Sequence, residues 1–158
     1  MFKDAYISQD GLYRYWLIRE WGAADKTVCF IMLNPSTADA TEDDPTIRRC
    51  IGFAKAWGYG RLVVVNLFAL RSTDPAKLLA PGDPIGSEND FQIYCCAQDC
   101  AAVVCAWGAH PAARGRDAAV IRQVRMTSTT LHYLKLTAGG APSHPLYLKS
   151  SLTPKVWA

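Results

Sequence analysis

Two asparagines stand where buried strands would end, and an amide in that position can take part in chemistry. Asn34 follows the apolar run Thr27–Leu33. Pro35 biases Asn34 toward an extended backbone and cannot continue a strand ladder, so the Asn34 side chain is displayed at the strand end. There the amide can orient a water molecule or hold the edge of a ligand, although an Asx-type turn would use the same residue.

Asn66 ends a second apolar run, which begins at Leu62. A polar amide at the end of such a strand is costly if it is buried without partners. It therefore either satisfies local backbone groups or binds a ligand through its paired donor and acceptor. Together Asn34 and Asn66 could form a small polar pocket, or each could serve its own turn.

Two further segments add an imidazole and two guanidinium groups. His144 lies between a glycine-rich stretch and Pro145, so we expect it on a rigid turn, where its ring is either simply exposed or able to donate a hydrogen bond to a developing anion. Arg114 and Arg116 follow Gly108 and lie at the start of a helical pattern that begins at Ala112. They could contact phosphate at the start of that helix or could remain solvated.

Composition limits the classes of protein to consider. The 158 residues are half hydrophobic and one-fifth charged, with a net charge of +3, which predicts one globular domain over residues 1–158. Neither a membrane-spanning run nor a secretory signal is evident, so the cytoplasm is the expected location. The six cysteines lie mostly among core-type residues and lack CxxC spacing, which favours reduced thiols and no metal site.

Short apolar runs alternate with helical patterns along the chain. This alternation predicts an α/β fold, a single three-layer α/β/α domain with a central, mostly parallel sheet. Ligands in such sheets bind at the carboxyl ends of the strands, where the polar residues above would lie. We expect strands at Ala5–Ser8, Tyr13–Trp21, Thr27–Leu33, Leu62–Leu67, Ala102–Trp107 and Thr130–Leu136, and helices at Asp44–Trp57, Glu88–Ala101 and Ala112–Met126.

Motifs spread over nearly the whole chain resemble those of a bacterial and phage family of unknown function, DUF1643. They are LNPSTAD, DPTIRRC, WGYG, NLFALRSTDP and GxPxHPLYL. More distantly, the ordered segments FIMLNPSTA, VVVNLFALR, VVCAWGAHPA and SHPLYL resemble the motifs of the uracil-DNA glycosylase superfamily. That distant resemblance implies a uracil-DNA-glycosylase-like domain that needs neither metal nor cofactor.

The glycosylase resemblance also implies residue roles. A base flipped out of DNA would be hydrogen-bonded by Asn66, the attacking water would be held by Asn34, and the departing base would be stabilised by His144. The superfamily usually stacks an aromatic residue on the base shortly after its first motif, and this chain has none there, so Phe68, Phe53 or Trp107 could replace it. The remaining implied contacts are Pro35 to the base, Pro145, Leu146 and Tyr147 inserted into the duplex, and Arg114, Arg116, Lys149, Ser150 and Ser151 to DNA phosphates.

The sequence thus predicts a DNA glycosylase that hydrolyses the N-glycosidic bond of uracil or another altered base. Its expected partner is single- or double-stranded DNA, with no membrane and no obligate protein partner. Two alternatives stay open: a non-catalytic nucleic-acid or nucleotide-binding module of the same fold, and a hydrolase of free nucleosides or nucleotides. The modest charge of +3 would suit the second of these.

Overall fold

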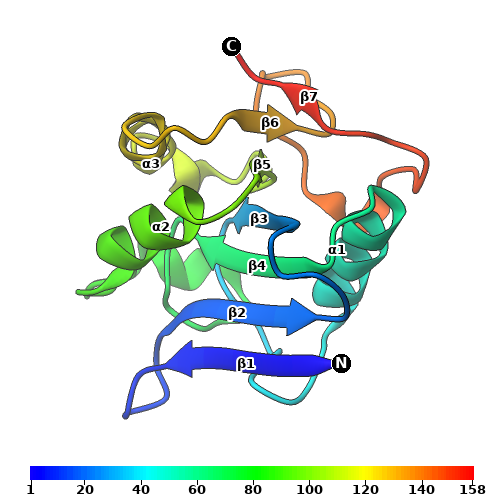
Figure 1. Ribbon diagram of the computed structural model, residues 1–158. Helices are drawn as coiled ribbons and strands as arrows, with labels where there is room; N and C mark the ends of the chain where they lie inside the picture. The colour runs from blue at the N-terminus through cyan, green and yellow to red at the C-terminus, as the bar shows by residue number, and fades with distance from the viewer.

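One seven-stranded sheet runs through the computed structural model, which describes residues 1–158. The strands lie in the order β1-β2-β4-β3-β5-β6-β7, with β1 and β7 at opposite edges (Figure 1). Their bounds are β1 Phe2–Ile7, β2 Arg14–Glu20, β3 Thr27–Met32, β4 Arg61–Asn66, β5 Ala102–Cys105, β6 Leu131–Tyr133 and β7 Lys155–Val156.

The sheet is mixed, which corrects the expectation of a mostly parallel one. The four central strands, β4, β3, β5 and β6, pair in parallel. The outer strands β1, β2 and β7 add antiparallel pairings. Link length explains the antiparallel pairing of β1 with β2, because a parallel pair needs a crossover of a dozen or more residues. The link between β1 and β2 is too short for that, whereas each central crossover contains a helix.

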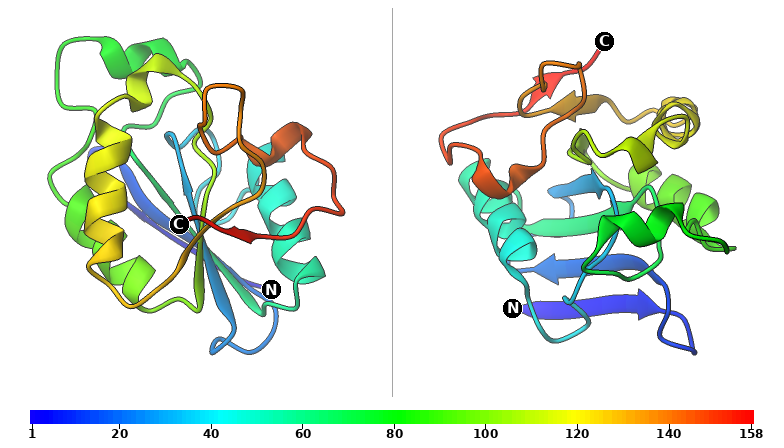
Figure 2. Two further views of the ribbon diagram at one scale, coloured as in Figure 1. Left: turned by 90° about the horizontal axis from the view of Figure 1, so that it is seen from above. Right: turned by 180° about the vertical axis from the view of Figure 1, so that it is seen from behind.

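Helices cover both faces of the sheet and give three layers. Helix α1 (Pro45–Ala56) packs on one face, and α2 (Asn89–Gln98) and α3 (Arg116–Arg125) pack on the other (Figure 2). Each face has its own hydrophobic cluster, one built on Phe30 and α1 and the other on Ile31, α2 and α3. The α/β class and the alternation of strands and helices are confirmed.

Several details differ from the sequence expectation. The third helix begins at Arg116 rather than Ala112, because Gly115 has φ +79° and interrupts the chain there. Residues Pro111–Ala113 before it form a short 3-10 helix, η2. Two further 3-10 helices, η1 (Pro75–Leu79) and η3 (Pro145–Tyr147), and the two-residue strand β7 were not expected.

Helix α1 begins as its sequence predicts. Asp44 caps it, with Oδ1 accepting a hydrogen bond of 2.8 Å from the backbone N–H of Ile47, and Pro45 occupies the first turn, where it is tolerated. At the other end, Gly58 has φ +86°. Asp44 is buried beside the segment that follows β3, so this cap also fixes a wall of the site described below.

The six cysteines carry free thiols. Cys29, Cys50, Cys100 and Cys105 are buried, and Cys95 and Cys96 are half-buried. Burial raises the pKa of Cys96 to about 12, and the neighbouring thiols act in the same direction. The Cys96 thiol is therefore protonated at neutral pH, and the four buried cysteines sit in the core as small hydrophobic side chains.

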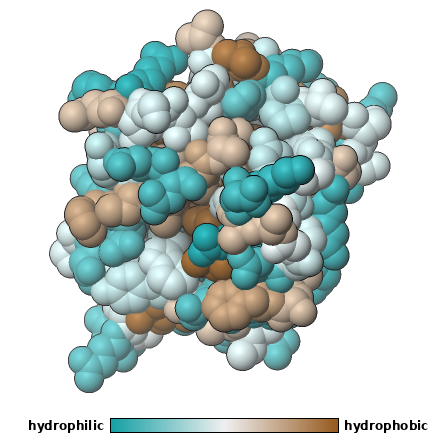
Figure 3. All heavy atoms as spheres, in the orientation of Figure 1, coloured by the Kyte–Doolittle hydropathy of each residue, from teal (hydrophilic) through white to brown (hydrophobic).

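On the molecular surface, the face shown in Figure 3 carries hydrophobic residues in small groups separated by hydrophilic ones. None of the helices combines the length and the apolar character that a membrane crossing requires.

Gly60 is required where the loops before β3 and β4 touch. The backbone N–H groups of Trp21 and Gly22 both donate to its carbonyl oxygen at 3.0 Å. A Cβ at position 60 would lie 2.5 Å from the carbonyl oxygen of Ala23. We expect Gly60→Ala to lower the free energy of unfolding, measured in urea, by about 1–3 kcal/mol, as other overpacked sites do.

Gly52→Ala is the matched control for that substitution. Gly52 lies within α1, and a Cβ there would meet nothing within 4 Å. Because alanine favours the helical state over glycine, this variant should be about 0.5–1 kcal/mol more stable. Equal stabilities for the two variants would show that the loop contact at Gly60 does not constrain the fold.

Candidate functional site

A cavity of about 180 Å³ lies at the carboxyl ends of the central strands. It is lined by Asn34 beyond β3, Asn66 at the end of β4, Trp107 beyond β5, and His144 before η3. The sequence therefore predicted correctly that the two amides and the imidazole of residue 144 share one cavity. Their chemical roles stay predictions.

Strand pairing explains why the two amides meet. Met32 pairs with Asn66 in the parallel register of β3 and β4. The pairing continues past the strand ends, since the N–H of Leu67 donates to Met32 O at 2.8 Å and that of Phe68 to Leu33 O at 3.0 Å. Asn34 follows directly, so the register brings it to the same edge of the sheet as Asn66.

The Asn34 side chain bonds to backbone carbonyls of two loops and keeps one acceptor for a ligand. Its Nδ2 donates to Ser72 O at 2.9 Å and to Pro35 O at 3.1 Å. The amide nitrogen therefore joins the segment after β3 to the loop after β4, and the Asx-type turn, in which Oδ1 would accept from a backbone N–H, is not formed. No side-chain or backbone donor is bonded to Oδ1, which lies on a half-buried residue of the cavity wall and can accept a hydrogen bond from a water or a ligand.

Asn66 presents an unpartnered donor. The residue is 1% exposed, and its Nδ2 has no hydrogen-bond partner. Leaving such a group unsatisfied costs about 1–3 kcal/mol, which a ligand with an acceptor at that place would recover. The backbone here is fixed by the buried Asn89 of α2, whose Nδ2 donates to Asn66 O at 3.0 Å and to Leu67 O at 3.1 Å. No pattern in the sequence indicates this role for Asn89, which lies within an ordinary helical pattern.

His144 is held as a neutral donor. It precedes η3, and its Nδ1 accepts a hydrogen bond of 3.2 Å from the backbone N–H of Leu146. Desolvation lowers the pKa of His144, with the charge of Asp44 opposing that change. The ring is thus neutral at pH 7, with its proton on Nε2, because Nδ1 acts as the acceptor.

A glycine joins the β5 end to the His144 segment. The N–H of Gly108 donates to Pro142 O at 2.8 Å, and Gly108 has φ +78°. A Cβ at Gly108 would lie 3.8 Å from the Cβ of His144. This hydrogen bond and close approach place the imidazole beside Trp107, which is 2% exposed and lines the cavity.

His110 has the same local structure as His144 but does not line this cavity. It also precedes a proline and a 3-10 helix, and its Nδ1 accepts from the N–H of Ala112 at 3.1 Å. It lines a neighbouring cavity of about 550 Å³ together with Arg114. Trp107 lines both cavities, which are therefore adjacent.

Arg14 is a wall residue that the sequence did not indicate. It is the first residue of β2 and only 2% exposed, and its Nη1 donates to Ala38 O at 3.0 Å. Burial lowers the pKa of Arg14 to about 10, with Asp44 opposing that change, so the side chain is still a cation at pH 7. Its contacts lie far along the chain, and an arginine at the start of a strand ordinarily faces solvent.

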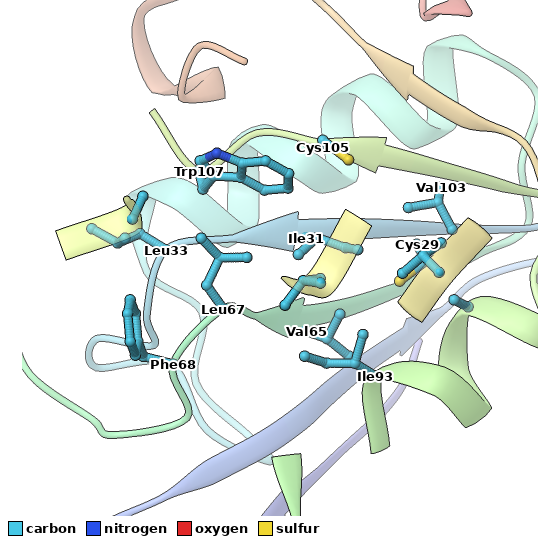
Figure 4. Close-up of a cluster of buried hydrophobic side chains, with 14 of the residues drawn as sticks. Cys29, Ile31, Leu33, Val65, Leu67, Phe68, Ile93, Val103, Cys105 and Trp107 are labelled. Atoms are coloured by element: carbon cyan, nitrogen blue, oxygen red, sulfur yellow. The ribbon is translucent and has the colours of Figure 1, made fainter. Parts of the chain in front are cut away.

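Two predicted site residues are used elsewhere. Phe68 is buried with Leu33, Leu67 and Trp107 in a hydrophobic cluster and does not line the cavity (Figure 4). Arg116 donates from Nε to Leu67 O at 2.8 Å and pairs with Asp90 at 2.7 Å, so it supports the β4 end from behind. Pro35, in contrast, lines the cavity as predicted.

Of the residues after His144 that were predicted to contact DNA, Pro145 is buried, which contradicts its predicted insertion, and the others lie on a largely exposed segment. Tyr147 is 93% exposed, and Leu146 is half-buried in the same 3-10 helix. Lys149, Ser150 and Ser151 are exposed directly after it. A large aromatic side chain so exposed beside the cavity is free to contact a partner.

Comparison with known proteins gives a family and no function. A family model described as a protein of unknown function, DUF1643, matches residues 14–146. Neither the curated proteins nor the solved structures contain a match to this chain.

Proposed function

We propose that this chain, which belongs to the DUF1643 family, hydrolyses the N-glycosidic bond of an altered base that has been flipped out of DNA. The observation that carries the proposal is the convergence of Asn34, Asn66 and the neutral His144 on one small cavity. The helices on both faces of the sheet and the order of the motifs support the resemblance to uracil-DNA glycosylases as part of the same proposal.

The size of the cavity supports a single heterocycle as its occupant. Sites for drug-sized ligands have volumes of about 300–1,000 Å³. The volume here is about 180 Å³, which suits one ring with small substituents better than a whole nucleotide. The ends of the β-strands line the cavity, so a base can enter it only after leaving the DNA stack.

The side chains then act in sequence on the bound nucleotide. The Asn34 Oδ1 accepts a hydrogen bond from a water molecule and holds it toward the sugar C1′. The bond from C1′ to the base breaks, the base takes the electron pair and leaves as an anion, and the water oxygen bonds to C1′. The Nε2–H of His144 donates to that anion as it forms, and the proton lost by the water restores the neutral base.

The surface beside the cavity supports DNA as the partner. Tyr147 and Leu146 would fill the space that the flipped base leaves, since apolar and aromatic wedges offset part of the unstacking cost. Lys149 and Arg114 are exposed cations on either side of His144 in the chain and would contact phosphates.

The test is a panel of single- and double-stranded oligonucleotides that contain uracil, hypoxanthine, xanthine or a modified pyrimidine. We expect abasic sites, detected as strand breaks after alkali, with at least one of these bases. No break with any oligonucleotide at high protein concentration overturns the proposal. A free-nucleoside hydrolase, which the net charge of +3 would suit, would instead release base from nucleosides without the steep salt dependence of DNA binding.

Asn66 should determine which base is accepted. We expect Asn66→Asp to reduce kcat/KM for the preferred carbonyl-bearing base at least about tenfold relative to the amino-bearing analogue. The reason is that the carboxylate removes the unpartnered Nδ2 donor and leaves only acceptors. Competition between the two oligonucleotides measures the ratio. An unchanged ratio would show that Asn66 does not contact the base.

A further inference from the structure

A buried cation in the cavity wall has no partner for one of its donors. Arg14 is 2% exposed and lines the cavity, and its Nε has no hydrogen-bond partner. The ion pairs of the chain involve Lys3, Arg19 and Arg116, so no carboxylate pairs with Arg14. A buried charge without a partner is costly.

A second buried arginine on the same strand shows how this fold satisfies such a group. Arg19, also in β2, is completely buried. Its Nε lies 2.7 Å from Asp43 Oδ1, and its Nη2 donates to Asp39 O and Glu42 O. In contrast, the fold leaves the buried Nε of Arg14 without a partner on a residue that lines the cavity, so an acceptor on a ligand in the cavity would satisfy it.

We propose that Arg14 binds the ligand, and that it selects a base bearing a second carbonyl oxygen in addition to the one held by Asn66. The proposal deepens the function proposed above and rests on the cavity taking a base. Both residues offer unpartnered donors, Nε–H on Arg14 and Nδ2–H on Asn66. A dioxo base such as uracil or xanthine presents carbonyl acceptors to two donors, whereas cytosine has an amino group in place of one oxygen and adenine has no carbonyl oxygen.

The same cation also favours bond cleavage. The departing base carries negative charge on its oxygens, so a guanidinium that binds one of them stabilises the leaving group together with His144. Arg14 remains protonated at pH 7, because its pKa, although lowered by burial, is about 10. The guanidinium needs no proton transfer to act.

An anionic oxygen from a phosphate would satisfy the same donor. Binding experiments with uracil, cytosine, uridine 5′-monophosphate and inorganic phosphate separate the two sources. With the natural chain we expect uracil to bind at least about tenfold more tightly than cytosine, and phosphate alone not to compete. Competition by inorganic phosphate would assign Arg14 to a phosphate and overturn the selection of a dioxo base.

Arg14→Met tests the residue directly, with Arg71→Met as the matched control. We expect Arg14→Met to weaken uracil binding about tenfold or more, as loss of a charged hydrogen bond does, and to bring uracil and cytosine closer together. Arg71 lies near enough to affect the pKa of Arg14 but does not line the cavity, so its variant should bind like the natural chain. Unchanged uracil binding in a folded Arg14→Met protein overturns the proposal.

Two further probes keep the outcome interpretable. Arg14→Lys is the alternative if Arg14→Met does not fold, because lysine keeps the positive charge at this position. It lacks the Nε donor, so it should still bind uracil more weakly than the natural chain. In 2-thiouracil and 4-thiouracil, sulfur replaces one carbonyl oxygen of uracil. The natural chain should bind the analogue that lacks the oxygen held by Arg14 more weakly than uracil. In Arg14→Lys, uracil and that analogue should bind equally. If the oligonucleotides are cleaved but the Arg14 variants bind uracil normally, the proposed function stands and this inference is rejected. If the Arg14 variants bind uracil more weakly but no oligonucleotide is cleaved, this inference stands and the proposed function is rejected.

Discussion

Replacing His144 with alanine should lower the rate of base release about a hundredfold or more. The ring holds its Nε2–H as a donor because Nδ1 accepts from the backbone N–H of Leu146 at 3.2 Å. Removal of a preorganised donor from a developing anion typically has an effect of this size. Single-turnover cleavage of the preferred oligonucleotide measures the rate, and oligonucleotide affinity should change much less.

His110→Ala is the control for the structural part of that effect. His110 has the same proline neighbour and the same Nδ1 contact to a backbone N–H, at 3.1 Å, but it lines the adjacent cavity. Both variants remove a 3-10 helix cap, so similar changes in thermal stability are expected, with the loss of rate confined to the His144 variant. Equal losses of rate would show that the cap, and not the donor, is what His144 contributes.

The pH profile gives a second check on the state of the ring. Desolvation lowers the pKa of His144 in the folded chain, with Asp44 opposing it. The neutral donor therefore predominates at pH 7, and the rate should change little between about pH 7 and 8. A rate that falls steadily over this range would indicate that the imidazolium form is the active one instead.

The strand ends could be predicted because their signals are local. Proline after Asn34 and the β-branched run before Asn66 mark where two strands stop, and Asp44-Pro45 marks the start of α1. Parallel pairing then brings the two amides to one edge. Local signals of this kind gave the α/β class and the cavity position, whereas the roles of the residues remain predictions.

Features that depend on distant contacts were missed for a physical reason. The burial of Arg14 depends on the loop that contains Ala38. Phe68 lies in the core because the chain turns inward after β4. The antiparallel strand β7 was also missed, since it has only two residues and carries no pattern. Such properties arise from the assembled sheet and not from any window of sequence.

The largest effect on stability is expected where Arg19 and Asp43 meet. Arg19 is completely buried, and its Nε lies 2.7 Å from Asp43 Oδ1. Asp43→Ala leaves that cation buried without a carboxylate, so we expect the free energy of unfolding to fall by about 3–5 kcal/mol. Urea denaturation measures it. Lys3→Met removes the other cation paired with Asp43, which is more exposed, and should cost no more than about 1 kcal/mol.

Acid should reduce the stability of the natural chain through the same pair. Desolvation acts to raise the pKa of Asp43, but the hydrogen bond and charge of Arg19, helped by Lys3, outweigh it, and the pKa is lowered. Because the folded pKa is below the unfolded value of about 3.9, the pair stabilises the fold fully above that pH and progressively less as the pH falls through the folded pKa. Asp43→Ala should lack this part of the acid dependence, and an identical dependence would contradict the assignment.

The pair also links stability to the site. Arg19 Nη2 donates to Asp39 O and to Glu42 O at 3.1 Å. The segment between Asn34 and the cap of α1 is therefore hydrogen-bonded to β2 through this side chain. We therefore expect Asp43→Ala to increase amide hydrogen exchange in residues 36–44 before it does so in β3 or β4. Uniform loss of protection across the sheet would mean that Arg19 supports the whole fold and not specifically the wall that carries Asn34.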